Sequence, residues 1–163
     1  DAARLLGINM LNVHTPADNA VAKFVEELIR KAKPRCVGDV WEAINKVPEY
    51  REAKRQGAGP MLFSGNKNSR AGKIVVSEMT GGTEGSKEIY QAMANAGVGT
   101  IISMHQSEDH RKAAEEAHIN VIVAGHISSD SLGMNLFLDE LEKEGIEIVP
   151  MGGLIRISRN KKK

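Results

Sequence analysis

The sequence predicts an α/β fold with a mostly parallel or mixed sheet and helices packed on it, layered α/β/α. From residue 73 onward, apolar runs of strand length alternate with longer segments of helical periodicity. Such alternation requires crossover connections, which place successive strands parallel in one sheet. The length of 163 residues is close to that of one domain and sufficient to bury a core. We therefore expect a single domain over residues 1–163.

The N-terminal part is expected to contain a short strand followed by a long helix. Residues 8–13 (INMLNV) form an apolar run typical of a buried strand, and Pro16 prevents a helix from extending back through it. From Val21 to Ile29, apolar residues recur at the spacing of one helix face. This helix should end near Lys33, just before a proline.

A second helical pattern begins at Asp39 and closes on Gly57. Pro48 interrupts or restarts it, because proline cannot donate the backbone hydrogen bond that a helix interior needs. Tyr50 in this segment is interpreted as part of a solvated helix face.

The remaining elements are expected in regular order. Residues 61–65 (MLFSG) and 73–79 (KIVVSEM) are predicted strands, and the polar, turn-rich loop between them is compatible with a hairpin. Residues 154–158 (LIRIS) alternate apolar and polar side chains, as an antiparallel edge strand does. Between these segments we expect helices over 86–96, 107–118 and 130–144, and strands over 98–104, 120–124 and 146–149.

Composition and charge exclude several classes of function. There are 22 Lys and Arg against 21 Asp and Glu, so no overall field attracts nucleic acid or an anionic membrane. No apolar run approaches the length of a membrane span, and the N-terminus lacks a signal-peptide pattern. The single cysteine, Cys36, excludes an internal disulfide and a cysteine-cluster zinc site. We expect a cytoplasmic protein.

Three histidines end predicted strands, and two of them are followed by an aspartate four residues later. His14 precedes Asp18, His126 precedes Asp130, and His105 ends the run GTIISMH. For either pair alone, a histidine filling a strand end and an aspartate N-cap is the more common explanation. If the strands are neighbours in a parallel sheet, however, all five side chains converge at its carboxyl edge.

Side chains of this kind favour a metal site. Imidazole and carboxylate ligands without thiolates suit zinc, manganese, iron, cobalt or nickel, and ligand type alone does not choose among them. Five protein ligands exceed the need of one open catalytic zinc. One or two divalent ions are therefore expected, and a bridging carboxylate is chemically reasonable for two.

The glycine-rich loop MTGGTEGS follows a predicted strand and precedes a predicted helix. Its backbone N–H groups and the helix N-terminus are suited to an anionic group of a small ligand, although a tight turn needed for packing explains the glycines equally well. The loop lacks the P-loop and dinucleotide-binding spacings. His110, in a polar helix, is interpreted as solvated and receives no role. The candidate anion-binding residues are Thr80, Gly81, Gly82, Thr83, Gly85 and Ser86.

Three segments resemble the Nif-three-like family, also called GTP cyclohydrolase-like dinuclear metal proteins: HTPADNAVAKFVEELI, GGTEGS before a helix, and GHISSDSLGMNLFLDELEKEGIEIV. The resemblance covers most of residues 8–150. It implies that Asp18 is a metal ligand with His14 beside it, and that His126 and Asp130 are ligands. Most members carry Glu where this chain has Asp130, and many carry an acid where it has His105.

The resemblance also implies ring-shaped homo-oligomers. The family's other ligands are two adjacent histidines upstream of the first motif, and this chain contains no His-His pair. Either the chain is a fragment or naturally short form with an incomplete site, or His105 substitutes for part of what is missing.

The leading hypothesis is a metal-dependent hydrolase that acts on a small phosphorylated or nucleotide-like substrate through a metal-activated water. The first alternative is a non-catalytic metal-binding or regulatory module. The second is phosphate binding by the glycine loop without a metal.

Overall fold

The computed structural model describes residues 1–77, 79 and 84–160. Its strands are β1 (Met61–Ser64), β2 (Lys73–Val76), β3 (Val98–Ser103) and β4 (Asn120–Val123). Its helices are α1 (Ala2–Leu5), α2 (His14–Ala32), α3 (Val37–Asn45), α4 (Pro48–Arg55), α5 (Ile89–Asn95), α6 (Glu108–Glu116) and α7 (His126–Lys143).

The four strands form one mixed sheet in the order β1-β4-β3-β2. β2, β3 and β4 are parallel, and β1 pairs antiparallel with β4. The predicted mixed α/β sheet is therefore confirmed, but the predicted hairpin of β1 and β2 is wrong, since these strands form opposite edges. β3 and β4 are almost entirely buried and take the centre, whereas β1 and β2 are partly exposed.

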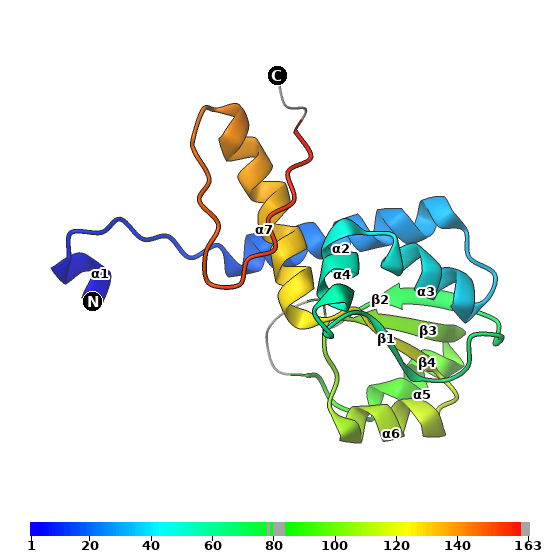
Figure 1. Cartoon of the computed structure of the whole chain (residues 1–163). Helices are drawn as coiled ribbons and strands as arrows, with labels where there is room; N and C mark the ends of the chain where they lie inside the picture. The colour runs from blue at the N-terminus through cyan, green and yellow to red at the C-terminus, as the bar shows by residue number, and fades with distance from the viewer. Residues whose placement is uncertain (78, 80–83, 161–163) are drawn as a thin grey trace.

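Helices cover both faces of the sheet, as the predicted α/β/α layering requires (Figure 1). On one face Ile102 of β3 and Ile122 of β4 pack with the apolar sides of α2, α3 and α4. On the other, the adjacent residues Ile101 and Val121 pack with α5 and α6. Successive strand residues point to opposite faces, so each central strand contributes to both layers.

Proline at residue 48 separates α3 from α4, which confirms that the second helical pattern restarts there. Pro48 is the first residue of α4, where its missing N–H has no helical partner to lose. Tyr50 in this helix is fully buried, so its predicted place on a solvated face is wrong. The apolar side of α4 turns it toward α7.

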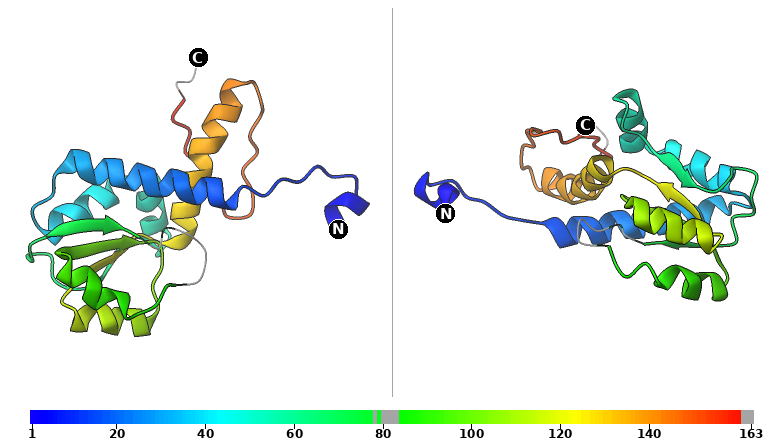
Figure 2. Two further views of the ribbon diagram at one scale, coloured as in Figure 1. Left: turned by 180° about the vertical axis from the view of Figure 1, so that it is seen from behind. Right: turned by 90° about the horizontal axis from the view of Figure 1, so that it is seen from below.

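Three segments predicted as strands are not strands. Residues 8–13 extend away from the body of the molecule in both views of Figure 2, and Ile8, Met10 and Leu11 in this arm are exposed. Residues 146–149 and 154–158 are also irregular. An apolar alternation becomes a strand only when another strand accepts its backbone hydrogen bonds, and the described sheet offers these segments no such partner.

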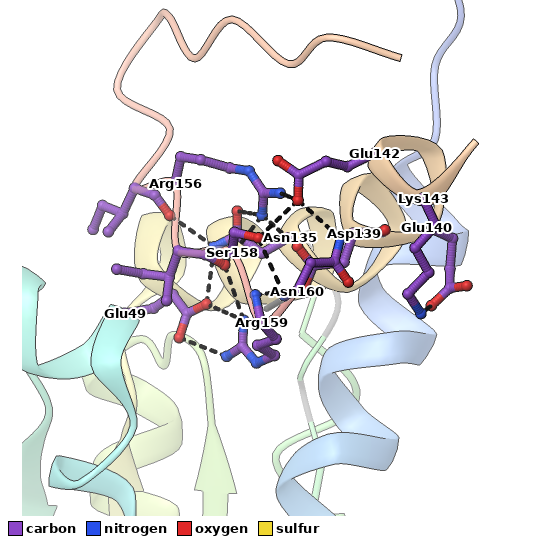
Figure 3. Close-up of polar contacts among 12 residues, drawn as sticks. Glu49, Asn135, Asp139, Glu140, Glu142, Lys143, Arg156, Ser158, Arg159 and Asn160 are labelled. Carbon is purple, nitrogen blue, oxygen red and sulfur yellow. Dashed lines mark hydrogen bonds and ion pairs between the residues drawn. The ribbon is translucent and has the colours of Figure 1, made fainter. Parts of the chain in front are cut away.

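The C-terminal segment 154–160 instead lies along α7 and is held there by polar side chains (Figure 3). The carboxylate of Glu49, which is fully buried, accepts hydrogen bonds from Arg159 Nη1 and Nη2 at 2.7 and 2.9 Å. Asn135 Nδ2 donates to the same carboxylate at 2.8 Å. Arg156 Nη1 donates to Asp139 Oδ1 at 2.7 Å. The backbone of Ile155, which a neighbouring strand would otherwise have paired, is bound by α7 as well: its N–H donates to Ser131 Oγ at 3.1 Å and its carbonyl oxygen accepts from Asn135 Nδ2 at 2.8 Å.

Replacing Arg159 with methionine should lower the free energy of unfolding by about 3 kcal/mol, because the buried Glu49 carboxylate loses its charged partner. Urea unfolding measures the loss. This loss lies at the low end of the range that is usual for breaking a buried ion pair, because 28% of the Arg159 side chain is exposed.

Two comparisons make this prediction specific. Adding Glu49→Gln to Arg159→Met should restore part of the lost stability, because the unpaired charge is removed. Arg55→Met, which breaks an exposed pair with Glu52, should leave the unfolding midpoint almost unchanged. Equal effects of Arg159→Met and Arg55→Met would contradict a stabilising role for the buried pair.

Candidate metal centre

His14 is the first residue of α2, and Asp18 lies one turn further along the same helix. Side chains four residues apart share one helix face, and His14 Nε2 is 3.4 Å from Asp18 Oδ2. The histidine is 55% exposed and the aspartate only 6%. This pair therefore forms a two-residue clip at the start of α2, with its carboxylate side toward the protein interior.

His126 and Asp130 repeat this arrangement at the start of α7. His126 Nε2 is 3.7 Å from Asp130 Oδ2, and both side chains are partly exposed. Gly125 between β4 and α7 has φ +104°, and a Cβ there would lie 2.8 Å from Ser128 Oγ, so glycine suits this strand-to-helix turn. The predicted position of each histidine at a strand end is wrong: both begin helices.

His105 follows β3 and lies against His126. The two imidazole rings are stacked, with centroids 5.1 Å apart and planes inclined by 19°. This contact arises because β3 and β4 are neighbouring parallel strands, so the segments that leave their carboxyl ends start side by side. The sequence-based expectation that these two histidines lie close together is met.

The pKa of the Asp130 carboxyl is shifted by burial and by the charges of the other four predicted ligands. Its pKa is raised, first by burial and also by the negative charge of Asp18. His126, followed by His14 and His105, acts in the opposite direction. The charges of both clips and of His105 thus contribute to the pKa shift of one carboxyl group.

The two clips meet because α2 and α7 pack closely. This is the most extensive contact between two helices in the described chain. At its centre, Gly133 of α7 lies against the backbone of Ala17, so close that an added Cβ would be 2.2 Å from the Ala17 carbonyl oxygen. Ala17 precedes Asp18, and Gly133 is one turn beyond Asp130. The small residue therefore brings the two carboxylate-bearing turns together, a role that the sequence alone did not reveal.

Tyr50 supports the turn that carries Asp130. Its hydroxyl is 3.1 Å from Ser129 Oγ, which itself donates to the Gly125 carbonyl oxygen at 2.6 Å, so the phenol is the donor to Ser129. Burial, the largest influence, raises the pKa of Tyr50, and the Ser129 hydrogen bond opposes it. The negative charges of Glu49 and Asp130 raise it further. The phenol therefore stays protonated and fixes the first turn of α7.

His110 is a second residue whose environment differs from the prediction. Only 12% of its side chain is exposed, so it is not solvated. Its Nδ1 is 3.3 Å from the Tyr90 hydroxyl, and its Nε2 is 3.8 Å from Glu84 Oε2. Burial raises the pKa of Glu84, but hydrogen bonds with Ser107 and the nearby His110 and His105 lower it more, so the net shift is downward. Glu84 thus adds negative charge on the His105 side of the centre.

Most of the predicted anion-binding loop cannot be compared with the structure. Thr80, Gly81, Gly82 and Thr83 lie outside the described residues. Gly85 and Ser86 are exposed, and Ser86 Oγ hydrogen-bonds to Glu88. α5 begins at Ile89, three residues later than the predicted start at 86. Anion binding by this loop therefore stays a prediction.

The chemistry of the side chains fits a divalent metal, but the arrangement is open. Three imidazoles and two carboxylates are the ligand types that transition metals use. Within residues 1–77, 79 and 84–160, however, no three His, Cys, Asp or Glu side chains are grouped closely enough to hold one ion. The structure brings two two-residue clips and His105 together without closing a complete coordination sphere.

Comparison with solved structures gives one strong similarity. The chain is similar to a NIF3 superfamily protein from Sphaerobacter thermophilus, with 33% sequence identity, a TM-score of 0.80 and coverage of 93% of this chain. The chain spans 56% of the length of that relative. Reduced HcgD from Methanocaldococcus jannaschii matches 60% of this chain and 38% of its own, at 19% identity and a TM-score of 0.40, which is too low to support any argument. No protein-family model and no curated protein matches.

No helix in the described part of the chain is both long and apolar enough to cross a bilayer.

Substituting Gly133 with alanine should force α2 and α7 apart and lower the free energy of unfolding by about 1–3 kcal/mol, the usual cost of overpacking. Thermal unfolding followed by circular dichroism measures the effect. Glu140→Ala, on the exposed side of the same helix, is the control and should shift Tm little. If Gly133→Ala is as stable as the parent protein, the close crossing does not constrain these helices.

Proposed function

The chain belongs to the NIF3 superfamily, and on this basis we propose that it binds one or two divalent metal ions and hydrolyses a small phosphorylated or nucleotide-like substrate. The proposed ligands are His14, Asp18, His105, His126 and Asp130. The observation that carries the proposal is geometric: the histidines of the two pairs lie 3.4 and 3.7 Å from their aspartates, and the ring of His105 stacks on that of His126, so residues from three separate segments of the chain are brought into contact two by two.

The electrostatics of the pair Asp18 and Asp130 support a cation between the clips. The negative charge of Asp18 raises the pKa of the Asp130 carboxyl, and a positive charge close to that carboxyl would stabilise its ionised form. The imidazole side chains beside these aspartates are of the type that coordinates divalent metals through a ring nitrogen when neutral. A divalent ion held there would supply Lewis acidity and activate water for hydrolysis near neutral pH.

The protein's own residues would organise this site from outside. Tyr50 and Ser129 hold the first turn of α7, which orients His126 and Asp130. Stacking on His126 restricts the ring of His105. Part of the His14 and His126 side chains is exposed, so a small substrate has access from solvent.

A second candidate function is metal binding without turnover, in a regulatory or interaction role. The observation that favours it is the open arrangement: no complete group of three ligands is present among the described residues. A self-associating form, with a small anionic ligand at the glycine loop, is compatible with both candidates. Measurements of binding and of turnover separate them.

Metal binding should require His126. We expect the protein, purified without a nickel column, to retain zinc, manganese, iron, cobalt or nickel in elemental analysis, and His126→Asn to lose most of it because one clip is broken. The matched control is His118→Asn, since His118 is exposed and has φ +57°, which asparagine tolerates. Equal metal content in His126→Asn, His118→Asn and the parent protein would contradict the proposed site.

Turnover should depend on the two aspartates. With manganese or zinc added, we expect hydrolysis of at least one phosphoester, nucleotide or cyclic-amide substrate. Asp18→Asn combined with Asp130→Asn should reduce the rate by about 100-fold or more, through loss of the activated water. Asp109→Asn, on the exposed first turn of α6, controls for charge removal. Activity that survives the double substitution would refute the proposed site, and metal binding without any turnover would favour the regulatory candidate.

A further inference from the structure

Positive charge is concentrated in one segment of the chain. Residues 30–73 contain eleven Lys and Arg against four Asp and Glu, a net charge of +7, although the whole chain carries only +1. The rest of the chain accordingly carries eleven basic and seventeen acidic residues, a net charge of −6. A nearly neutral total therefore conceals a strong separation of charge, which overall composition did not reveal.

The fold gathers part of this charge on one surface. The loop that contains Lys67 and Arg70 runs along the start of α3: Gly38 N donates to the Lys67 carbonyl oxygen at 2.8 Å, and Cys36 and Arg70 form an isolated β-bridge. Ala71 N also donates to the Arg35 carbonyl oxygen at 3.0 Å. These contacts place the exposed side chains of Arg35, Lys67 and Arg70 near one another.

Trp41 of α3 is in contact with one of these side chains, Lys67, and with a further lysine, Lys54. It is the one tryptophan of the chain and is partly exposed on α3. Lys67 Nζ is 3.6 Å and Lys54 Nζ 4.7 Å from the ring centroid, both within cation–π distance. We call the group of Arg35, Trp41, Lys54, Lys67 and Arg70 the Trp41 surface.

Acidic side chains nearby do not neutralise the Trp41 surface. The Asp39 carboxylate accepts backbone hydrogen bonds from Arg35 and Cys36, and these bonds lower its pKa, so it stays ionised and contributes one negative charge. Glu52 is paired with Arg55. Glu42 is exposed and contributes one negative charge. The four cations of the surface therefore outweigh the neighbouring acids.

The Trp41 surface and the candidate metal centre lie at opposite ends of the sheet. Lys67 and Arg70 precede β2, at the end where the parallel strands begin. His105 and His126 follow the carboxyl ends of β3 and β4. The metal centre therefore does not explain the Trp41 surface, and the two can be tested separately.

We propose that the Trp41 surface binds single-stranded nucleic acid. The cations bind successive phosphates, and a base stacks on the Trp41 ring in place of a lysine ammonium. An aromatic ring surrounded by cations is the arrangement that single-strand binding proteins use, because every base has a face to stack and every nucleotide carries a phosphate. The bases of a duplex are stacked inside the helix and cannot stack on the Trp41 ring. An acidic protein would interact with the cations of the surface but has no base to stack on the ring.

Two fluorescence measurements on the full chain test this proposal. Anisotropy of a labelled twelve-nucleotide oligothymidylate at about 20 mM salt should show saturable binding that weakens steeply as salt is added. Because Trp41 is the single tryptophan, its intrinsic fluorescence should be quenched by the unlabelled oligonucleotide at the same concentrations.

Charge-matched variants locate the binding surface. Lys67→Glu with Arg70→Glu should weaken binding by about tenfold or more, whereas Lys23→Glu with Lys112→Glu, the same charge change at exposed residues outside the segment, should weaken it less than about threefold. Trp41→Ala should cost about tenfold through lost stacking, and circular dichroism checks its folding.

Three results would overturn the proposal. They are no binding at low salt, equal weakening in the two charge variants, or binding of polyglutamate as tight as that of the oligonucleotide. The last result would indicate a site for acidic proteins.

Discussion

The close crossing of α2 and α7 is the constraint on which the rest of the site depends. Each His-x-x-x-Asp clip is formed within one helix by its 3.6-residue period, so each would exist on an isolated helix. What relates the clips to each other is the contact of Gly133 with the Ala17 backbone, at a distance that no residue with a Cβ allows. The turns that carry the two carboxylates lie side by side because α2 and α7 approach each other closely where Gly133 meets the Ala17 backbone.

The sheet contributes a different part of the arrangement. His105 and α7 follow the carboxyl ends of the parallel strands β3 and β4, at one end of the sheet. The basic loop before β2 lies at the other end. The two ends therefore carry opposite chemical characters: imidazoles with carboxylates at one, lysines and arginines around a tryptophan at the other. The mixed sheet therefore separates the candidate metal centre from the Trp41 surface within one fold.

Much of the fold could be predicted from the sequence because apolar periodicity reports burial. α2, the restart at Pro48 and the central strands β3 and β4 were predicted for this reason. Predictions failed where an element needs a partner that the periodicity does not specify. Residues 8–13 and 154–158 have the alternation of strands, but one extends from the body without a strand beside it and the other binds side chains of α7.

The candidate site shows the same division. The two His-Asp pairs and the contact of His105 with His126 are present in the structure, whereas metal binding by the five residues stays a prediction. The pairs could be recognised because His and Asp four residues apart share a face in any helix. Gly133, Tyr50 and the half-buried His110 were not predicted for their roles, since their importance arises from contacts between segments distant in the chain. Pairing of charges across helices is a property of packing, and no local pattern in the sequence encodes it.

A double-mutant cycle of metal affinity tests most directly whether the crossing of α2 and α7 creates one shared site. Manganese or zinc is titrated calorimetrically into the parent protein, Asp18→Asn, Asp130→Asn and the double variant. If the two aspartates share one site, the losses of metal-binding free energy caused by the two single substitutions should be coupled by about 1 kcal/mol or more. The double variant should then bind the metal only slightly more weakly than the weaker of the two single variants. Losses that add to within about 0.5 kcal/mol would show that the clips act independently and would contradict this account.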